Sequence, residues 1–337
     1  MKKTRIAVAI AATCALPAAA IAEDVTLRLS HWVPATIAPG QGIQMWADAV
    51  HEASEGRISF QVYPAQQLGS AVDHYDMARD GIADITWTNP GYTAGRFPIF
   101  ALSEVPFHVI DSIPGAKAVH EWYLDYAEVE MPDVKLCLVN PHGAGTLHSR
   151  EAMTVPGDIA GRNIRPAHAT MARFVSQLGG APVQVPAPEV REAISRGVAD
   201  AVTFPWGSMY DFNLTGETTH HLDMPFYISA QVLLINPGTY EGLSEENRAV
   251  IDDHCTPEWS TRISEHWAED DTNARERLLA DDSQTFHTPS EEDVAAWREA
   301  AEGVLESWRV DVAARGHDPD EIYEAYEAAL DANDARY

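Results

Sequence analysis

The sequence predicts an α/β protein whose two lobes face one cleft. Residues 78–87 and 194–203 share one local design, in which a helical pattern ends at a glycine and an aspartate turn leads into a short apolar strand. The first strand runs into a loop at Asn89 and the second into a loop at Phe204. Because ligands bind at the strand ends of open α/β sheets, two such units predict two lobes that offer loops to one cleft. The alternative explanation is ordinary αβ-loop chemistry, in which Gly-x-x-Asp after a helix is common.

The N-terminal residues predict export to the periplasm. Basic residues within 2–5 precede an apolar run over 6–16, and small residues lead to Ala22. A positive start, an apolar run too short to span a bilayer and an A-x-A-like cleavage site together form a secretory signal peptide. Residues 1–22 are therefore expected to be removed.

Charge and length limit the function classes. The 337 residues contain 51 Asp and Glu against 23 Lys and Arg, which gives a formal net charge of −28. Phosphate contacts need clustered Lys and Arg, so nucleic acid is not expected as a partner. The length suffices for two domains of ordinary size.

The first lobe is predicted to contain a parallel sheet. Its elements are, in order, a strand at 24–30, a helix at 41–54, a strand at 57–63, the unit at 78–87, a helix at 115–128 and a strand at 134–140. Strands that alternate with helices in this way are typical of parallel sheets.

The second lobe repeats this order. Its elements are a strand end at 163–165, a helix at 170–178, a strand at 182–185, a helix at 187–196 and the unit at 194–203. An apolar strand at 231–236 follows, and long helical stretches then continue to the end of the chain. The acidic, amphipathic tail after residue 318 is expected to pack on the outside as a helix.

Arg165 is the first candidate binding residue. It ends a predicted strand, and Pro166 directs the chain into a loop. A guanidinium at that position could hold a carboxylate through two parallel N–H···O bonds. The alternative role is a salt bridge at the surface or between the lobes.

Four spaced segments carry a family resemblance. They are 158–166 (DIAGRNIRP), 178–183 (LGGAPV), 188–194 (PEVREAI) and 197–200 (GVAD). Together they resemble the extracytoplasmic solute receptors of tripartite ATP-independent periplasmic (TRAP) transporters of the dicarboxylate-binding (DctP) type. Residues 31–39, 67–69 and 81–84 are also similar to that family.

The resemblance implies a two-lobed periplasmic binding protein fold with a hinge and long C-terminal helices. On this basis residues 23–142 with about 231–270 are expected to form lobe I, and residues 143–230 with about 271–325 to form lobe II. Residues 326–337 are expected to form a C-terminal helical tail. The implied partners are a small organic acid and the small and large integral membrane subunits of the transporter.

The resemblance also implies site residues. In that family the arginine of the I-R motif pairs with the ligand carboxylate, and Arg165 occupies this position. An asparagine that helps to hold the same ligand is replaced here by Phe204, and a second arginine of the sialic-acid-type members has no counterpart in the segment 142–146. A large polyhydroxylated sugar acid is therefore less expected.

Aromatic side chains replace these polar anchors. Candidate pocket aromatics in or beside the predicted loops are Trp32, Trp87, Tyr92, Phe204, Trp206 and Tyr210, and the polar candidates are His31, His74, Asn89 and His142. Aromatic rings bury apolar carbon and can also hold a cation. Each ring alone is more often a core residue than a ligand contact.

Catalysis and metal binding are not expected. The glycine-rich segment 142–145 is not accompanied by a G-x-S-x-G elbow, so a hydrolase lacks its nucleophile. His220 and His221 lack the further ligands of a zinc site, and the acidic C-terminal helices lack EF-hand spacing. No cofactor or metal is predicted, and the state of Cys137 and Cys255 stays open.

Three functions therefore remain. The first is a receptor for a small organic acid, preferably a monocarboxylate with an apolar or aromatic body, held by Arg165 and closure of the lobes. The second is the same receptor with an amine, quaternary ammonium or zwitterionic compatible solute held by rings. The third, a periplasmic hydrolase, is disfavoured.

Overall fold

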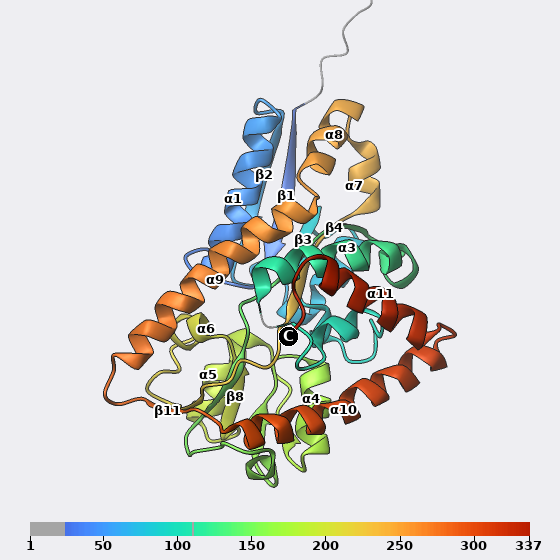
Figure 1. The fold of residues 1–337 in the computed structure, drawn as a ribbon. Coiled ribbons are helices and arrows are strands. Elements are labelled where there is room, and N and C mark those ends of the chain that lie inside the picture. The colour runs from blue at the N-terminus through green and yellow to red at the C-terminus, as the bar shows by residue number, and fades with distance from the viewer. Residues whose placement is uncertain (1–23, 110) are drawn as a thin grey trace, which may run out of the picture.

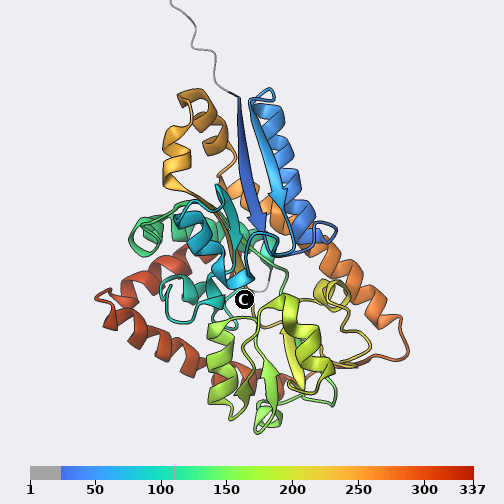
Figure 2. The same cartoon turned by 180° about the vertical axis from the view of Figure 1, so that it is seen from behind.

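The protein has two lobes, one above the other in Figure 1. The computed structural model describes residues 24–109 and 111–337, so the expected signal peptide lies outside the described residues. Each lobe contains one β-sheet flanked by helices (Figures 1 and 2). The predicted two-lobed α/β class is thus confirmed.

The first sheet lies in the upper lobe and has the order β2-β1-β3-β10-β4. Its strands are β1 (Val25–His31), β2 (Ile58–Tyr63), β3 (Ile85–Thr88), β4 (Lys135–Pro141) and β10 (Ala230–Ile235). β1 runs parallel to β2 and β3, whereas β10 is antiparallel to both of its neighbours. In the chain β10 comes after β5–β9 of the second sheet and before β11 of that sheet, so the chain crosses between the lobes on both sides of β10.

The second sheet lies in the lower lobe and has the order β11-β9-β5-β8-β6-β7. Its strands are β5 (Thr146–Ser149), β6 (Asn163–Arg165), β7 (Ala181–Pro182), β8 (Ala201–Phe204), β9 (His220–Leu222) and β11 (Thr285–His287). The predicted strand at 182–185 is shorter than expected. β5, β9 and β11 were not predicted, because strands of three or four residues leave little periodicity.

Helices cover both sheets. They are α1 (Ala38–Ala53), α2 (His74–Arg79), α3 (Ser112–Glu130), α4 (Ala169–Gln177), α5 (Val190–Ser195), α6 (Trp206–Asp211), α7 (Pro237–Gly242), α8 (Glu245–Asp253), α9 (Pro257–Leu279), α10 (Glu291–Ala314) and α11 (Pro319–Ala332). Within residues 24–109 and 111–337, no helix is long and apolar enough to cross a membrane.

Three C-terminal helices join the lobes. α9 packs against α1 and α3 of the upper lobe and against α6 of the lower lobe, and its diagonal course is visible in Figure 1. α10 packs against α4, and α11 returns to α3. α11 as a whole thus packs against the upper lobe, and the predicted lobe boundaries stay a prediction.

The two repeated units have equivalent structures. Gly81 and Gly197 both adopt a positive φ, at 67° and 70°, which glycine tolerates at a helix C-terminus. The Asp84 carboxylate accepts a hydrogen bond from the backbone N–H of Arg28 at 2.7 Å, and that of Asp200 accepts one from Asn163 at 2.9 Å. Each aspartate therefore ties its unit to the neighbouring parallel strand, which accounts for the repeated Gly-x-x-Asp pattern.

A disulfide links the two cysteines whose state the sequence left open. Cys137 in β4 and Cys255, just before α9, are bonded across 118 residues of chain. The bond attaches the start of α9 to the first sheet.

Candidate functional site

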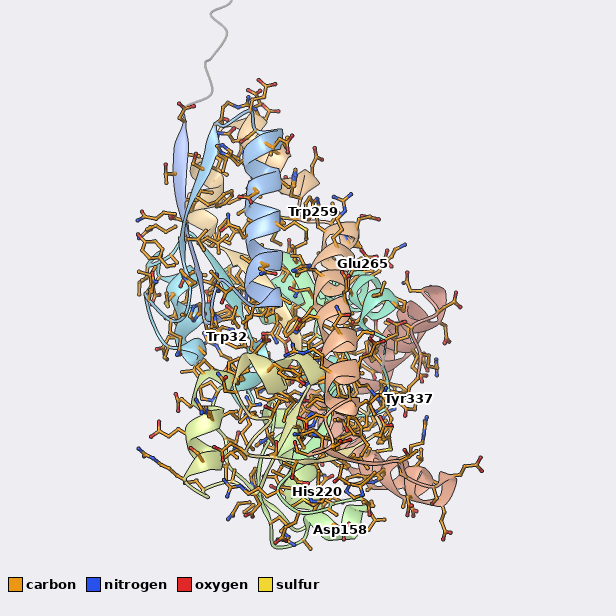
Figure 3. All side chains as sticks on the ribbon, turned by 90° about the vertical axis from the view of Figure 1, so that its left-hand side faces the viewer. Trp32, Asp158, His220, Trp259, Glu265 and Tyr337 are labelled. Atoms are coloured by element: carbon orange, nitrogen blue, oxygen red, sulfur yellow. A yellow bond between two sulfur atoms is a disulfide. The ribbon has the colours of Figure 1, made fainter. Side chains whose placement is uncertain are left out.

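A narrow cavity lies where the strand ends of the two lobes meet. Its lining residues are Trp32, Val33, Pro39, Asn89, Tyr92, His142, Arg165, Ala167, Ala187, Phe204, Pro205, Ser208, Asp211, Phe212, Ser229, Gln231 and Trp267. Asn89 follows β3 and Phe204 ends β8, so the strand ends of both repeated units face one cavity. Figure 3 shows Trp32 between the upper lobe, which holds Trp259, and the lower lobe, which holds His220.

Arg165 is the cation of this cavity. It ends β6 and is 1% exposed. Its Nε donates to the Val185 carbonyl at 3.0 Å and its Nη1 to the Thr203 carbonyl at 3.3 Å, but its Nη2 has no partner. Burial lowers the pKa of the guanidinium, and none of the ion pairs within the described residues includes it. An unpaired buried charge is costly, so this position favours an anionic ligand.

Aromatic rings form the walls around this cation. The Phe204 ring centre lies 4.6 Å from the Arg165 guanidinium carbon, and Phe204 stacks on Phe212 at 5.3 Å. On the upper lobe, Trp32 and Tyr92 pack with their ring centres 5.7 Å apart. Flat apolar walls next to one cation suit a carboxylate on an aromatic or apolar body.

Two predicted polar residues line the cavity but already use their hydrogen bonds. Asn89 donates from Nδ2 to the Ser229 hydroxyl at 3.3 Å and accepts from the Gly91 N–H at 2.9 Å. The His142 Nδ1–H donates to the Gly143 carbonyl, and burial lowers the His142 pKa to about 4, so its ring is neutral at pH 7. These two residues therefore contribute to the shape of the cavity and carry no charge.

Trp206 and Tyr210 do not line the cavity, contrary to the sequence prediction. Residues 206–211 form the helix α6 instead of the expected loop, and positions four apart lie on one face of a helix. Trp206 packs on Phe286 at 5.4 Å, and Tyr210 faces the Arg277 guanidinium at 3.8 Å. Ser208 and Asp211 on the opposite face of α6, and Phe212 directly after it, line the cavity instead, and none of the three was singled out from sequence.

Trp87, His31 and His74 also lie outside the cavity lining. Trp87 stacks on Trp32 at 5.2 Å and thereby supports the wall from within the core. His31 is 1% exposed at the end of β1. The His74 Nδ1–H donates to the Ser70 carbonyl at 2.8 Å and Nε2 accepts from the Ser30 hydroxyl at 3.2 Å, so His74 is a satisfied core residue.

Five buried polar atoms in the cavity lining have no hydrogen-bond partner. The three donors are Arg165 Nη2, Trp32 Nε1 and Trp267 Nε1, and the two acceptors are Gln231 Oε1 and Asp211 Oδ2. Buried polar groups in proteins are almost always paired, so a group of orphans around one cavity indicates a ligand. Gln231 could have been found from the sequence, because it is a single amide in an otherwise apolar strand. No sequence feature marked Trp267 in α9.

A buried acid lies next to the cavity wall and makes stability depend on pH. Desolvation raises the pKa of Asp271 to about 8, while its Oδ1 accepts from the Gly207 N–H at 2.7 Å. Folding therefore keeps a proton on Asp271 that the unfolded chain loses near its ordinary pKa of 3.8. Between these pKa values stability falls as pH rises, by up to about 1.4 kcal/mol per pH unit.

Asp271→Asn removes this titration and preserves the acceptor for Gly207. We expect the free energy of unfolding of the variant to fall less between pH 6.5 and 8 than that of the unmodified protein. Urea unfolding at several pH values in this window measures the difference, and equal slopes would contradict the assignment. This pH range lies well above the pKa values of His31, His120 and His142, which burial lowers to about 4, so these side chains do not titrate in it.

A larger hollow of about 540 Å³ lies beside α4 and α10 and is a weaker candidate. Its arginines are already engaged: Arg173 pairs with Asp311 at 2.5 Å, and Arg315 donates to the Gly95 carbonyl at 2.7 Å. Glu104, in the same lining, is buried, and desolvation raises its pKa well above the ordinary value. The smaller cavity at Arg165 therefore suits an anion better.

Comparison with known proteins identifies the family. The model of the bacterial extracellular solute-binding protein family 7, DctP, matches residues 29–310. The chain belongs to this family. Its members are solute receptors, and the resemblance to TRAP receptors seen in the sequence is thereby confirmed.

Solved structures and a curated relative agree with this family. A TRAP solute-binding protein from Rhodoferax ferrireducens, in complex with copurified benzoate, is 28% identical with a TM-score of 0.87, over 92% of this chain and 98% of the other. A marine metagenome TRAP solute-binding protein with 3-hydroxybenzoate is 29% identical with a TM-score of 0.87, over 93% and 99%. The ectoine-binding periplasmic protein TeaA of Halomonas elongata is 24% identical over 81% of both chains.

Proposed function

We propose that this receptor binds a small monocarboxylate with an aromatic or apolar body in the periplasm and delivers it to the membrane subunits of a TRAP transporter. The unpaired, buried Arg165 guanidinium carries this proposal, because a ligand carboxylate would supply its missing counter-charge. The orphan N–H groups of Trp32 and Trp267 offer further donors to the same carboxylate. The role is binding and not catalysis.

The similar receptors support the aromatic class. The Rhodoferax protein was obtained with benzoate, and the marine protein is described as specific for aromatic acid ligands. The walls of Trp32, Tyr92, Phe204 and Phe212 provide flat surfaces for such a ring.

Thermal unfolding with a ligand panel tests the proposal. Benzoate and phenylacetate are expected to raise the Tm by several degrees, because a ligand at 1,000 times its Kd adds about 4 kcal/mol to stability. Succinate, choline and hexylamine serve as dicarboxylate and cation controls and should leave the Tm unchanged. A shift with the amines and none with the acids would replace this proposal by the cation-binding alternative.

A zwitterion is the second candidate ligand, and one observation favours it. Asp211 places a carboxylate oxygen without a partner in the same lining as Arg165. Such a pair could hold an ammonium and a carboxylate of one molecule, and the relative TeaA is named for binding ectoine. Adding ectoine and glycine betaine to the panel distinguishes this candidate.

A further inference from the structure

Gln231 presents an unused acceptor to the cavity. It is 2% exposed, lies in β10, and lines the cavity with a side-chain oxygen that has no partner. β10 lies between β3 and β4 in the first sheet and is antiparallel to both, and Gln231 itself pairs with Asn140 of β4, so its backbone position is held by the sheet. A buried amide oxygen that is held on a rigid strand and has no partner is available to accept a hydrogen bond from a ligand.

Asp211 presents a second unpartnered polar atom from the other lobe. It ends α6, and its Oδ2 is buried without a partner in the same lining. Burial and the neighbouring Asp270 raise the pKa of Asp211 to about 7, so this carboxyl holds its charge weakly. A carboxyl that is partly protonated at neutral pH can donate to a hydroxyl oxygen, and it suits a neutral hydroxyl better than an ammonium ion.

We infer that the ligand carries a hydroxyl group in addition to its carboxylate, and that this hydroxyl donates its one hydrogen to Gln231 and accepts from the carboxyl O–H of Asp211. The ligand class is then a hydroxyl-bearing aromatic or apolar monocarboxylic acid, which deepens the proposed function and rests on it. The unpartnered donors of Arg165, Trp32 and Trp267 bind the carboxylate, Gln231 Oε1 accepts the hydroxyl hydrogen, and the protonated Asp211 carboxyl donates to the hydroxyl oxygen. Since Gln231 comes from the upper lobe and Asp211 from the lower lobe, one hydroxyl also links the two lobes across the closed cavity.

Asn140 is the neighbouring side chain that could give Gln231 a purely structural role. It lies opposite Gln231 in β4, and its Nδ2 also lacks a partner. However, its Oδ1 accepts from the Trp87 Nε1–H at 3.1 Å, and Asn140 does not line the cavity. A purely structural Gln231 would affect the Tm of the free protein but not the choice between ligands.

Calorimetric titration with matched acids tests the inference. The probes are benzoate, its 2-, 3- and 4-hydroxy derivatives, the corresponding methoxy derivatives and 3-(aminomethyl)benzoate. A methoxy group keeps the oxygen but removes the donated hydrogen. We expect at least one hydroxybenzoate to bind about tenfold or more tightly than benzoate and than its methoxy analogue, because an unfilled Gln231 acceptor penalises ligands that lack the donor.

Two variants test whether Gln231 and Asp211 cause the preference for the hydroxybenzoate. Gln231→Met and Asp211→Leu should each bring the preferred hydroxybenzoate to within about threefold of benzoate, measured as the ratio of the two Kd values for the same variant. Gln184→Met is the matched control, because Gln184 is exposed and outside this cavity, and it should keep the preference.

The outcomes separate this inference from the proposed function. Equal binding of benzoate and all hydroxybenzoates, a preference that survives both variants, or tighter binding of the aminomethyl acid would each overturn the inference and leave the receptor for aromatic acids intact. If none of the acids binds, the proposed function itself fails.

Discussion

Replacing Arg165 with alanine is expected to weaken binding of benzoate about thirtyfold or more. Loss of one partner of a buried, hydrogen-bonded charge pair costs about 2–5 kcal/mol, because the remaining charge is left unpaired in the closed cavity. Arg165→Lys restores the charge but not the fork of two parallel donors, so it should recover only part of the affinity. Calorimetric titration measures both constants.

Arg173→Ala is the matched control for this experiment. Arg173 is paired with Asp311 beside the larger hollow and does not line the Arg165 cavity. It should bind benzoate with unchanged affinity, while circular dichroism verifies that each variant is folded. If Arg165→Ala bound normally and Arg173→Ala did not, the ligand would occupy the larger hollow.

Removal of the disulfide is expected to have the largest effect on stability. The bond closes a loop of 118 residues, and cross-links of this kind contribute about 2–5 kcal/mol, mainly by restricting the unfolded chain. The double variant Cys137→Ser, Cys255→Ser should therefore lower the Tm by about 3–8 °C, given an unfolding entropy of about 2.1 cal/mol/K per residue. Differential scanning calorimetry measures the change.

Ligand affinity should survive this change, because neither cysteine lines the cavity. A reducing agent should lower the Tm of the unmodified protein to a similar extent and leave the double variant unaffected. A double variant with an unaltered Tm would show that the bond adds nothing to stability.

Local rules explain why the sequence could predict much of the fold. Gly81 and Gly197 end their helices because glycine alone tolerates their positive φ at low cost, and the aspartate that follows caps the neighbouring strand. These features depend on a few consecutive residues, so they can be recognised twice in one chain. Arg165 was located in the same way, at the last position of a strand before a proline.

The candidate site was only half predictable, and α6 shows the reason. Trp206 and Tyr210 looked like loop residues next to the cleft, but a helix over 206–211 turns both away and turns Asp211 and Phe212 inward. A six-residue helix has too few turns to leave a clear apolar period. Packing against α9 therefore decides which face of α6 points to the cavity.

The sequence by itself determined the class of the fold, the two strand ends that meet at the cavity and the cation of the cavity, since each depends on neighbouring residues. Only the tertiary structure decided which side chains complete the site and whether the cysteines meet. Gln231 enters through a strand that returns from the other lobe, and Trp267 through a helix that crosses both. Such contacts join residues far apart in the chain, and their geometry depends on how whole elements pack, which no local pattern encodes.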